Sequence, residues 1–167
     1  MESKPLLDIS KEQLEHILNP DVVLRELLSE KQVAEQLKLD PEDLAIMYRH
    51  ALELFKKEHY QDAAYAFFFL SFLDNTNFDI WIGLGMSLQM TQHYEAAIIA
   101  YELAAVREIE NPIPYFYLAK CLFAIHDHKA ALEAIEMAIE YSEDQPKFAE
   151  ILEQSRTAKA SLLRRQA

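Results

Sequence analysis

Glycine is nearly missing from this chain, which has 2 glycines in 167 residues where average usage of about 7% would give roughly twelve. Hairpin turns, phosphate-binding loops and dinucleotide-binding turns all use glycine for backbone conformations that other residues avoid. All-β folds and Rossmann-type folds are therefore poor candidates. The sequence predicts an all-α protein.

Cysteine is equally scarce, because Cys121 is the single one. One cysteine excludes an internal disulfide and a cysteine-rich zinc site, and we expect a buried structural thiol. The run His126-Asp127-His128 could suggest a metal, but side chains two residues apart on a helix point in different directions. The sequence has no nucleophile elbow, Walker lysine or zincin motif. We expect no catalytic residues, no metal and no cofactor.

Positive charge is also in short supply, since 16 Lys and Arg residues stand against 28 Asp and Glu residues, for a net charge of −12. A nucleic-acid backbone requires a basic surface, so we expect no nucleic-acid partner. The longest apolar stretch, residues 63–73, is too short to span a bilayer as a helix, and we expect no stable membrane insertion. The N-terminus lacks a signal-peptide pattern, so the chain is predicted to be cytoplasmic.

A 34-residue period organises the middle of the chain in three contiguous frames, residues 44–77, 78–111 and 112–145. This is the length of a tetratricopeptide repeat, which is a pair of antiparallel helices. The eighth and twentieth residues of a repeat lie where its two helices touch most closely, so only small residues fit there. The small pairs in the three frames are Ala51 and Ala63, Gly85 and Ala97, and Ala119 and Ala131.

Helical signals also flank the repeats. Within residues 1–43, Ser10-x-x-Gln13 is a capping box and Asn19-Pro20 a helix start, and Asp40-Pro41 repeats the cap-then-proline signal before the first repeat. Residues 146–167 begin with proline and continue as an amphipathic helix with a basic tail. The predicted architecture is a superhelix of three helix-turn-helix repeats, an N-terminal helical extension for capping or dimerisation, and a C-terminal capping helix.

The first helix of each repeat in this family lines a concave groove, with positions 2, 5, 9, 12 and 13 facing it. Here these positions are largely apolar and rich in methionine, which usually marks a partner site; an alternative is that some of them pack against the N-terminal helices. They include the charged residues Lys56, Asp79 and Lys120, but not the clamp that captures a terminal carboxylate. We expect the groove to bind an extended apolar segment kept straight by prolines. Its predicted lining residues are Tyr48, Leu52, Phe55, Ile82, Met86, Met90, Phe116 and Phe123.

The three repeats together resemble the class II chaperones of bacterial type III secretion, the SycD/LcrH/IpgC group. The resemblance spans residues 10–155 and rests on the runs LAIMYRHALELFKKEHYQDAAYAFFFLSFLD, FDIWIGLGMSLQMTQHYEAAIIAYELAAV and NPIPYFYLAKCLFAIHDHKAALEAIEMAI. It implies a cytosolic chaperone, not an enzyme, that binds a Pro-x-Leu-x-x-Pro-like segment of hydrophobic translocator proteins. By position, the binding aromatic residues of the first repeat are Tyr48, Phe55 and Tyr60, whereas Leu52 stands where many members have an aromatic residue.

The resemblance also implies a homodimer that forms through the N-terminal helices and the first repeat. An alternative function from a different class is a non-catalytic tetratricopeptide scaffold that links two cytosolic proteins. In that case the N-terminal helix of the chain itself would fill the groove.

Overall fold

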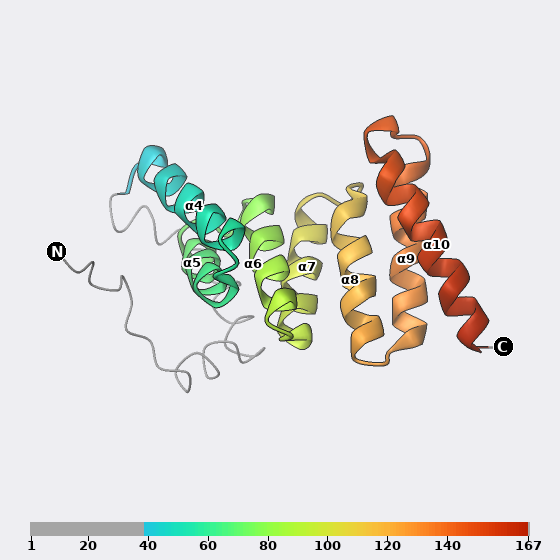
Figure 1. Cartoon of the computed structure of the whole chain (residues 1–167). Helices are drawn as coiled ribbons and strands as arrows, with labels where there is room; N and C mark the ends of the chain where they lie inside the picture. Colours follow the sequence, from blue (N-terminus) through green and yellow to red (C-terminus); the bar gives the residue numbers. More distant parts are fainter. Residues whose placement is uncertain (1–38, 167) are drawn as a thin grey trace. The chain divides into compact units, whose positions relative to one another are not determined.

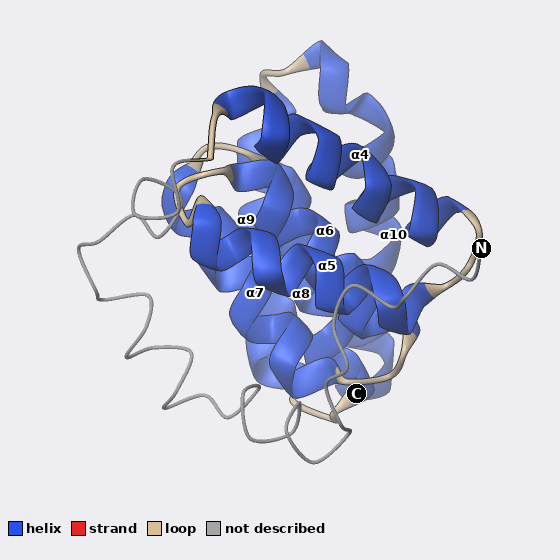
Figure 2. Ribbon diagram, turned by 90° about the vertical axis from the view of Figure 1, so that its left-hand side faces the viewer, coloured by secondary structure: helices blue, strands red, loops and turns tan. Residues whose placement is uncertain are grey.

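The computed structural model describes residues 39–166, all of which belong to one compact unit. In this part of the chain the regular elements are seven α-helices, labelled α4 to α10 in Figure 1, and one 3-10 turn. The helices stand in a row in chain order (Figure 1), and Figure 2 views this row from its α4–α5 end. The all-α prediction is confirmed. The predicted N-terminal helices, with the signals at Ser10 and Asn19-Pro20, lie outside the described residues.

Three helix pairs form most of the unit. The second and third pairs fall within the predicted frames 78–111 and 112–145, whereas the first pair begins three residues before the predicted frame 44–77. The pairs are α4 (Pro41–Lys56) with α5 (Tyr60–Leu73), α6 (Phe78–Met90) with α7 (Tyr94–Arg107), and α8 (Pro112–Ala124) with α9 (His128–Glu143). The last helix, α10 (Ala149–Gln166), begins three residues later than the proline suggested, because Pro146–Phe148 forms the 3-10 turn. The structure is therefore the predicted tetratricopeptide superhelix.

The first pair begins at the predicted cap. The Asp40 side chain accepts hydrogen bonds from the backbone N–H groups of Glu42 and Asp43, both at 2.9 Å. The Asp43 carboxylate accepts one in return from the Asp40 N–H at 3.1 Å. Pro41 occupies the first turn, where its missing N–H has no partner to lose. The start of α4 is therefore fixed by local interactions of the Asp40-Pro41-Glu42-Asp43 segment.

The two helices of each pair are joined by the same turn three times. Glu58, Gln92 and His126 have φ angles of 62°, 64° and 66°, in the left-handed region. In each turn the next N–H bonds back five residues at 2.9 Å, for example from His93 to the Leu88 carbonyl. This is the Schellman arrangement, in which glycine normally takes the left-handed position. The chain makes these turns without glycine.

Both glycines serve close packing inside α6. A Cβ atom at Gly83 would lie 2.5 Å from the Phe67 ring, and one at Gly85 would lie 2.6 Å from the Tyr101 ring. The predicted small pairs are buried as well, since Ala51, Ala63, Ala97 and Ala131 are 0% exposed and Ala119 is 4% exposed. Both glycines are therefore explained by close packing against aromatic rings.

Successive pairs are tied together at two loop carbonyls. Trp81 Nε1 donates to the Asn75 carbonyl at 2.8 Å, and the Tyr115 hydroxyl donates to the Ile109 carbonyl at 3.0 Å. The Arg107 guanidinium also donates to the Asn75 carbonyl and lies 5.0 Å from the centre of the Trp81 ring. Asn75 and Ile109 stand where the repeat pattern has a proline. In this chain, hydrogen bonds from side chains fix these loops instead of a proline.

The end of the row is covered by α10, which packs on α9 and touches α8. On its packed side Ser155 is 0% exposed and Leu162 is 6% exposed. Lys159 Nζ lies 2.7 Å from a carboxylate oxygen of Glu136 on α9. The opposite side of α10 carries the exposed charged residues Glu153, Arg156 and Arg164, so the helix closes the apolar end of the repeat array as a cap.

Candidate functional site

The first helices of the three repeats form a continuous layer, because α4 contacts α6 and α6 contacts α8. Along α6, and along α8 as far as Lys120, most accessible residues recur every three or four positions, so each helix has one open side. We call the open side of α4, α6 and α8 the groove face. The groove face of α6 consists of Asp79, Ile82, Met86, Gln89 and Met90. The groove face of α8 consists of Ile113, Tyr117, Lys120 and Ala124.

The first repeat contributes an aromatic group to the groove face. The Tyr48 ring lies edge-on to Phe67 with centroids 5.8 Å apart, and Phe55 lies edge-on to Tyr60 at 5.1 Å. Such edge-to-face pairs hold rings in defined orientations. Tyr48, Phe55, Tyr60 and the intervening Leu52 are all half-buried, so each has both a packed and an accessible side. The structure therefore pairs Phe55 with Tyr60, and spaces Tyr48, Leu52 and Phe55 by three or four residues along α4.

Tyr48 also reaches toward α6. Burial raises the pKa of the Tyr48 hydroxyl, and the nearby Asp79 carboxylate raises it further. The hydroxyl is therefore protonated at neutral pH and can donate a hydrogen bond. This end of the groove face combines aromatic surface with one donor and one carboxylate.

The second repeat supplies flexible apolar side chains. Met90 is 51% exposed, and Ile82 and Met86 are half-buried on the same side of α6. Methionine is unbranched and polarisable, so it adapts to different ligand side chains. All three side chains are thus accessible on one side of α6.

The third repeat departs from its predicted pattern at one position. Phe116 is only 6% exposed, so its ring belongs mainly to the core. The adjacent Tyr117 is the accessible ring; it stacks on Tyr101 with centroids 5.6 Å apart and lies edge-on to Phe116 at 5.3 Å. Sequence reasoning missed Tyr117 because periodicity does not resolve one-residue rotations of a helix. Phe123 is half-buried, with its ring 5.2 Å from that of His128.

Lys120 extends over these rings. Its Nζ atom lies 5.2 Å from the Phe116 centroid and 5.4 Å from the Tyr117 centroid, within cation–π range. It is the only charged residue in α8, as Asp79 is in α6. The groove face of α6 and α8 is therefore uncharged except for one carboxylate and one ammonium group.

The residues considered for chemistry do not assemble into a reactive site. Cys121 is 0% exposed, and burial raises the pKa of its thiol to about 12, so the thiolate nucleophile is scarce at neutral pH. The predicted buried thiol is confirmed. The His126 and His128 rings lie 6.0 Å apart. Residues 39–166 contain no group of three His, Cys, Asp or Glu side chains placed to hold a metal ion.

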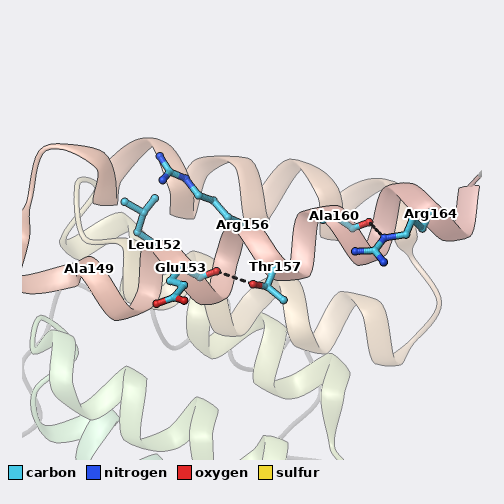
Figure 3. Close-up of a pocket in the computed structure, with 7 residues that line it drawn as sticks. All are labelled: Ala149, Leu152, Glu153, Arg156, Thr157, Ala160 and Arg164. Atoms are coloured by element: carbon cyan, nitrogen blue, oxygen red, sulfur yellow. Dashed lines mark hydrogen bonds between the residues drawn. The ribbon is translucent and has the colours of Figure 1, made fainter.

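Two open hollows lie outside the apolar part of the groove face. One adjoins Tyr60 and is lined by Glu58, His59 and Thr91, among others. The other follows the outer side of α10 (Figure 3), where its lining residues are Ala149, Leu152, Glu153, Arg156, Thr157, Ala160 and Arg164. Both are mixed surfaces without a convergent set of reactive groups. Within the described part of the chain, no helix combines the length and apolar character needed to cross a membrane.

Comparison with known proteins agrees with the repeat analysis. The tetratricopeptide repeat family model matches residues 46–77 and 79–108, which correspond to the first two helix pairs. The chain is similar to the low calcium response locus protein H of Yersinia pseudotuberculosis, with 28% identity over 114 residues that cover 68% of each protein. This relative supports the family resemblance that the sequence indicated.

Solved structures give the same result. The chain resembles the type III secretion chaperone SycD of Yersinia enterocolitica in complex with a peptide of the translocator YopD, with a TM-score of 0.74, 25% identity, and coverage of 77% of this chain and 98% of SycD. A second SycD structure, described as an alternative dimer, has a TM-score of 0.73, 26% identity, and coverage of 76% and 96%. The resemblance to this group of translocator chaperones is confirmed.

Proposed function

We propose that the chain, a relative of the type III secretion translocator chaperones, is a cytoplasmic, non-catalytic chaperone of hydrophobic translocator proteins. It binds an extended, proline-containing segment of its client on the groove face and keeps the client soluble and competent for export. The observation that carries this proposal is the accessible apolar layer of α4, α6 and α8. SycD, to which the chain is similar, is known in complex with a translocator peptide.

The mechanism is one of occupancy. A translocator has apolar segments that would aggregate, or enter the wrong membrane, before export. Aromatic and methionine side chains on the groove face cover part of such a segment. A proline-rich segment is already extended, so it loses little conformational entropy when it binds. The net charge of −12 repels other copies of the loaded complex and anionic membranes.

We further propose that the chain forms a homodimer. SycD, at 26% identity, has been solved as an alternative dimer. The predicted dimer contacts are the N-terminal helices and the first repeat. Light scattering on the purified full chain tests this part, with a mass near twice 19.4 kDa expected.

Co-expression with a candidate hydrophobic translocator, followed by size-exclusion chromatography with light scattering, tests the function. We expect a soluble complex with a client that is insoluble when it is expressed alone. A precipitated client beside an unchanged chaperone peak would contradict the proposal.

A double variant, Tyr48→Ala with Phe55→Ala, tests the groove assignment. Because both rings contribute to the groove face, we expect client co-purification to be lost while circular dichroism shows unchanged helicity. The matched control is Val106→Ala with Ile109→Ala, which removes apolar side chains that are 71% and 61% exposed outside the groove face. Retained client binding in the Tyr48/Phe55 variant would overturn the assignment.

The second candidate, a scaffold whose groove is filled by its own N-terminal helix, makes an opposite prediction for deletion of residues 1–40. A chaperone of this family would lose its dimer or part of its client. A scaffold inhibited by its own N-terminal segment would gain ligand binding.

A further inference from the structure

Lys120 is an isolated charge in an otherwise apolar part of the groove face. It is exposed, whereas the neighbouring Phe116 is buried and Tyr117 is half-buried. The ion pairs of residues 39–166 use Lys129, Arg156 and Lys159, and no carboxylate in this part of the chain pairs with Lys120. Lys56, Lys57 and Lys147 also lack an ion pair among residues 39–166, but Lys120 differs from them because it lies on an α-helix with no other charged residue.

The two rings determine where this charge lies. With Nζ 5.2 Å and 5.4 Å from two ring centroids, the ammonium group is held above the α8 surface. Ring faces attract a cation but accept no ordinary hydrogen bonds from it, so the three N–H donors of Nζ remain available to water or to a ligand.

A bound segment would change the surroundings of this charge. An apolar segment lying across α8 would displace water from Nζ, and loss of hydration without a compensating acceptor is unfavourable. A carboxylate on the segment would restore the lost interactions through a charge-assisted hydrogen bond. A lysine or arginine at the same place would be repelled. Lys120 thus favours bound segments with an acidic residue at this place and disfavours segments with a basic residue there.

We propose that Lys120 is a specificity-determining residue that selects client segments with an aspartate or glutamate side chain opposite the third repeat. The inference rests on the proposed function of the groove face and adds a chemical requirement to it. The client segment is then apolar and proline-containing, with one acidic residue at a defined distance from the residues that contact the first repeat.

A charge scan with synthetic peptides tests the proposal. The probes are fluorescein-labelled peptides that keep Pro-x-Leu-x-x-Pro, have alanine elsewhere, and carry glutamate or glutamine at each variable position in turn. We expect one position at which the glutamate peptide binds the full chain about tenfold more tightly than the glutamine peptide, as measured by fluorescence anisotropy at low salt. The difference should shrink as salt is added.

Variants assign the effect to one side chain. Lys120→Met keeps an unbranched side chain of similar length, and we expect it to abolish the difference between glutamate and glutamine. Lys129→Met removes the same charge from a side chain that is 90% exposed on α9, and should leave the difference unchanged. Lys120→Glu should reverse the preference, so that a lysine peptide binds more tightly than a glutamate peptide.

The outcomes separate this inference from the proposed function. If peptides bind the unaltered chain but no position distinguishes glutamate from glutamine, or if the difference survives in Lys120→Met, Lys120 does not select the client and only this inference fails. If no peptide binds the unaltered chain, the groove proposal fails and takes this inference with it.

Discussion

Single residues in the left-handed region explain how a chain with 2 glycines builds the same turn three times. Glu58, Gln92 and His126 occupy the position that glycine usually takes in a Schellman turn. A Cβ in this conformation costs about 1 kcal/mol. The helices on both sides pack against each other and impose the turn, so tertiary contacts offset the local strain.

Gln92→Gly is therefore expected to stabilise the protein. Glycine removes the steric strain at φ 64° but adds freedom to the unfolded chain, so we expect a net increase of about 0.5 kcal/mol in the free energy of unfolding. Urea unfolding followed by circular dichroism measures it. Gln92→Ala keeps the Cβ and is the control; an alanine variant as stable as the glycine variant would contradict the explanation.

At the scale of elements, the loops between repeats depend on specific side-chain donors. The Asn75 carbonyl accepts hydrogen bonds from Trp81, at the start of α6, and from Arg107, at the end of α7. One loop is thus bonded to both helices of the next repeat. The arginine also stacks on the indole ring, so the three groups form one junction.

Trp81→Phe should weaken this junction without opening a large cavity. The indole N–H is lost, and with it the 2.8 Å hydrogen bond to Asn75. Because a typical intramolecular hydrogen bond contributes about 1 kcal/mol and some ring volume is also lost, we expect destabilisation by about 1–2 kcal/mol.

Thermal and urea unfolding measure the effect of Trp81→Phe. The control is Tyr94→Phe, which removes a hydroxyl that bonds to no group among residues 39–166. Equal stability of the two variants would show that the indole N–H does not hold the loop.

For the whole molecule, the question is how a row of repeats ends. Each helix pair buries apolar surface against the next pair, and the last pair has no successor. α10 takes that place with a packed side that includes Leu162 and an outer side that carries Glu153, Arg156 and Arg164. Figure 3 shows these three charged residues as sticks along α10, together with Ala149, Leu152, Thr157 and Ala160.

Deleting residues 149–167 should expose the apolar side of α9. We expect a loss of about 3–5 kcal/mol in the free energy of unfolding, from the buried Leu162 and the half-buried apolar side chains of α10, together with self-association on size-exclusion chromatography. Arg156→Ala is the control: it breaks an exposed ion pair with Glu143 that should contribute less than about 1 kcal/mol. If the truncated chain stays monodisperse and unfolds like the full chain, α10 is not a required cap.

Much of this architecture was predictable because its causes are local or repetitive. Small residues at a 34-residue spacing indicate close helix pairs wherever those helices lie in space, and Ala51, Ala63 and Ala131 are indeed 0% exposed. A carboxylate followed by proline starts a helix through bonds within four residues, as Asp40 does for α4.

The sequence by itself determined the all-α class, the repeat length and the apolar positions within the first helices, since these depend on composition and on spacing along the chain. Only the tertiary structure decided which of two neighbouring side chains is accessible to solvent. Phe116 and Tyr117 are adjacent aromatic residues, yet packing buries the first ring and leaves the second accessible beneath Lys120. Burial depends on contacts between helices far apart in the sequence, and neither composition nor periodicity contains that information.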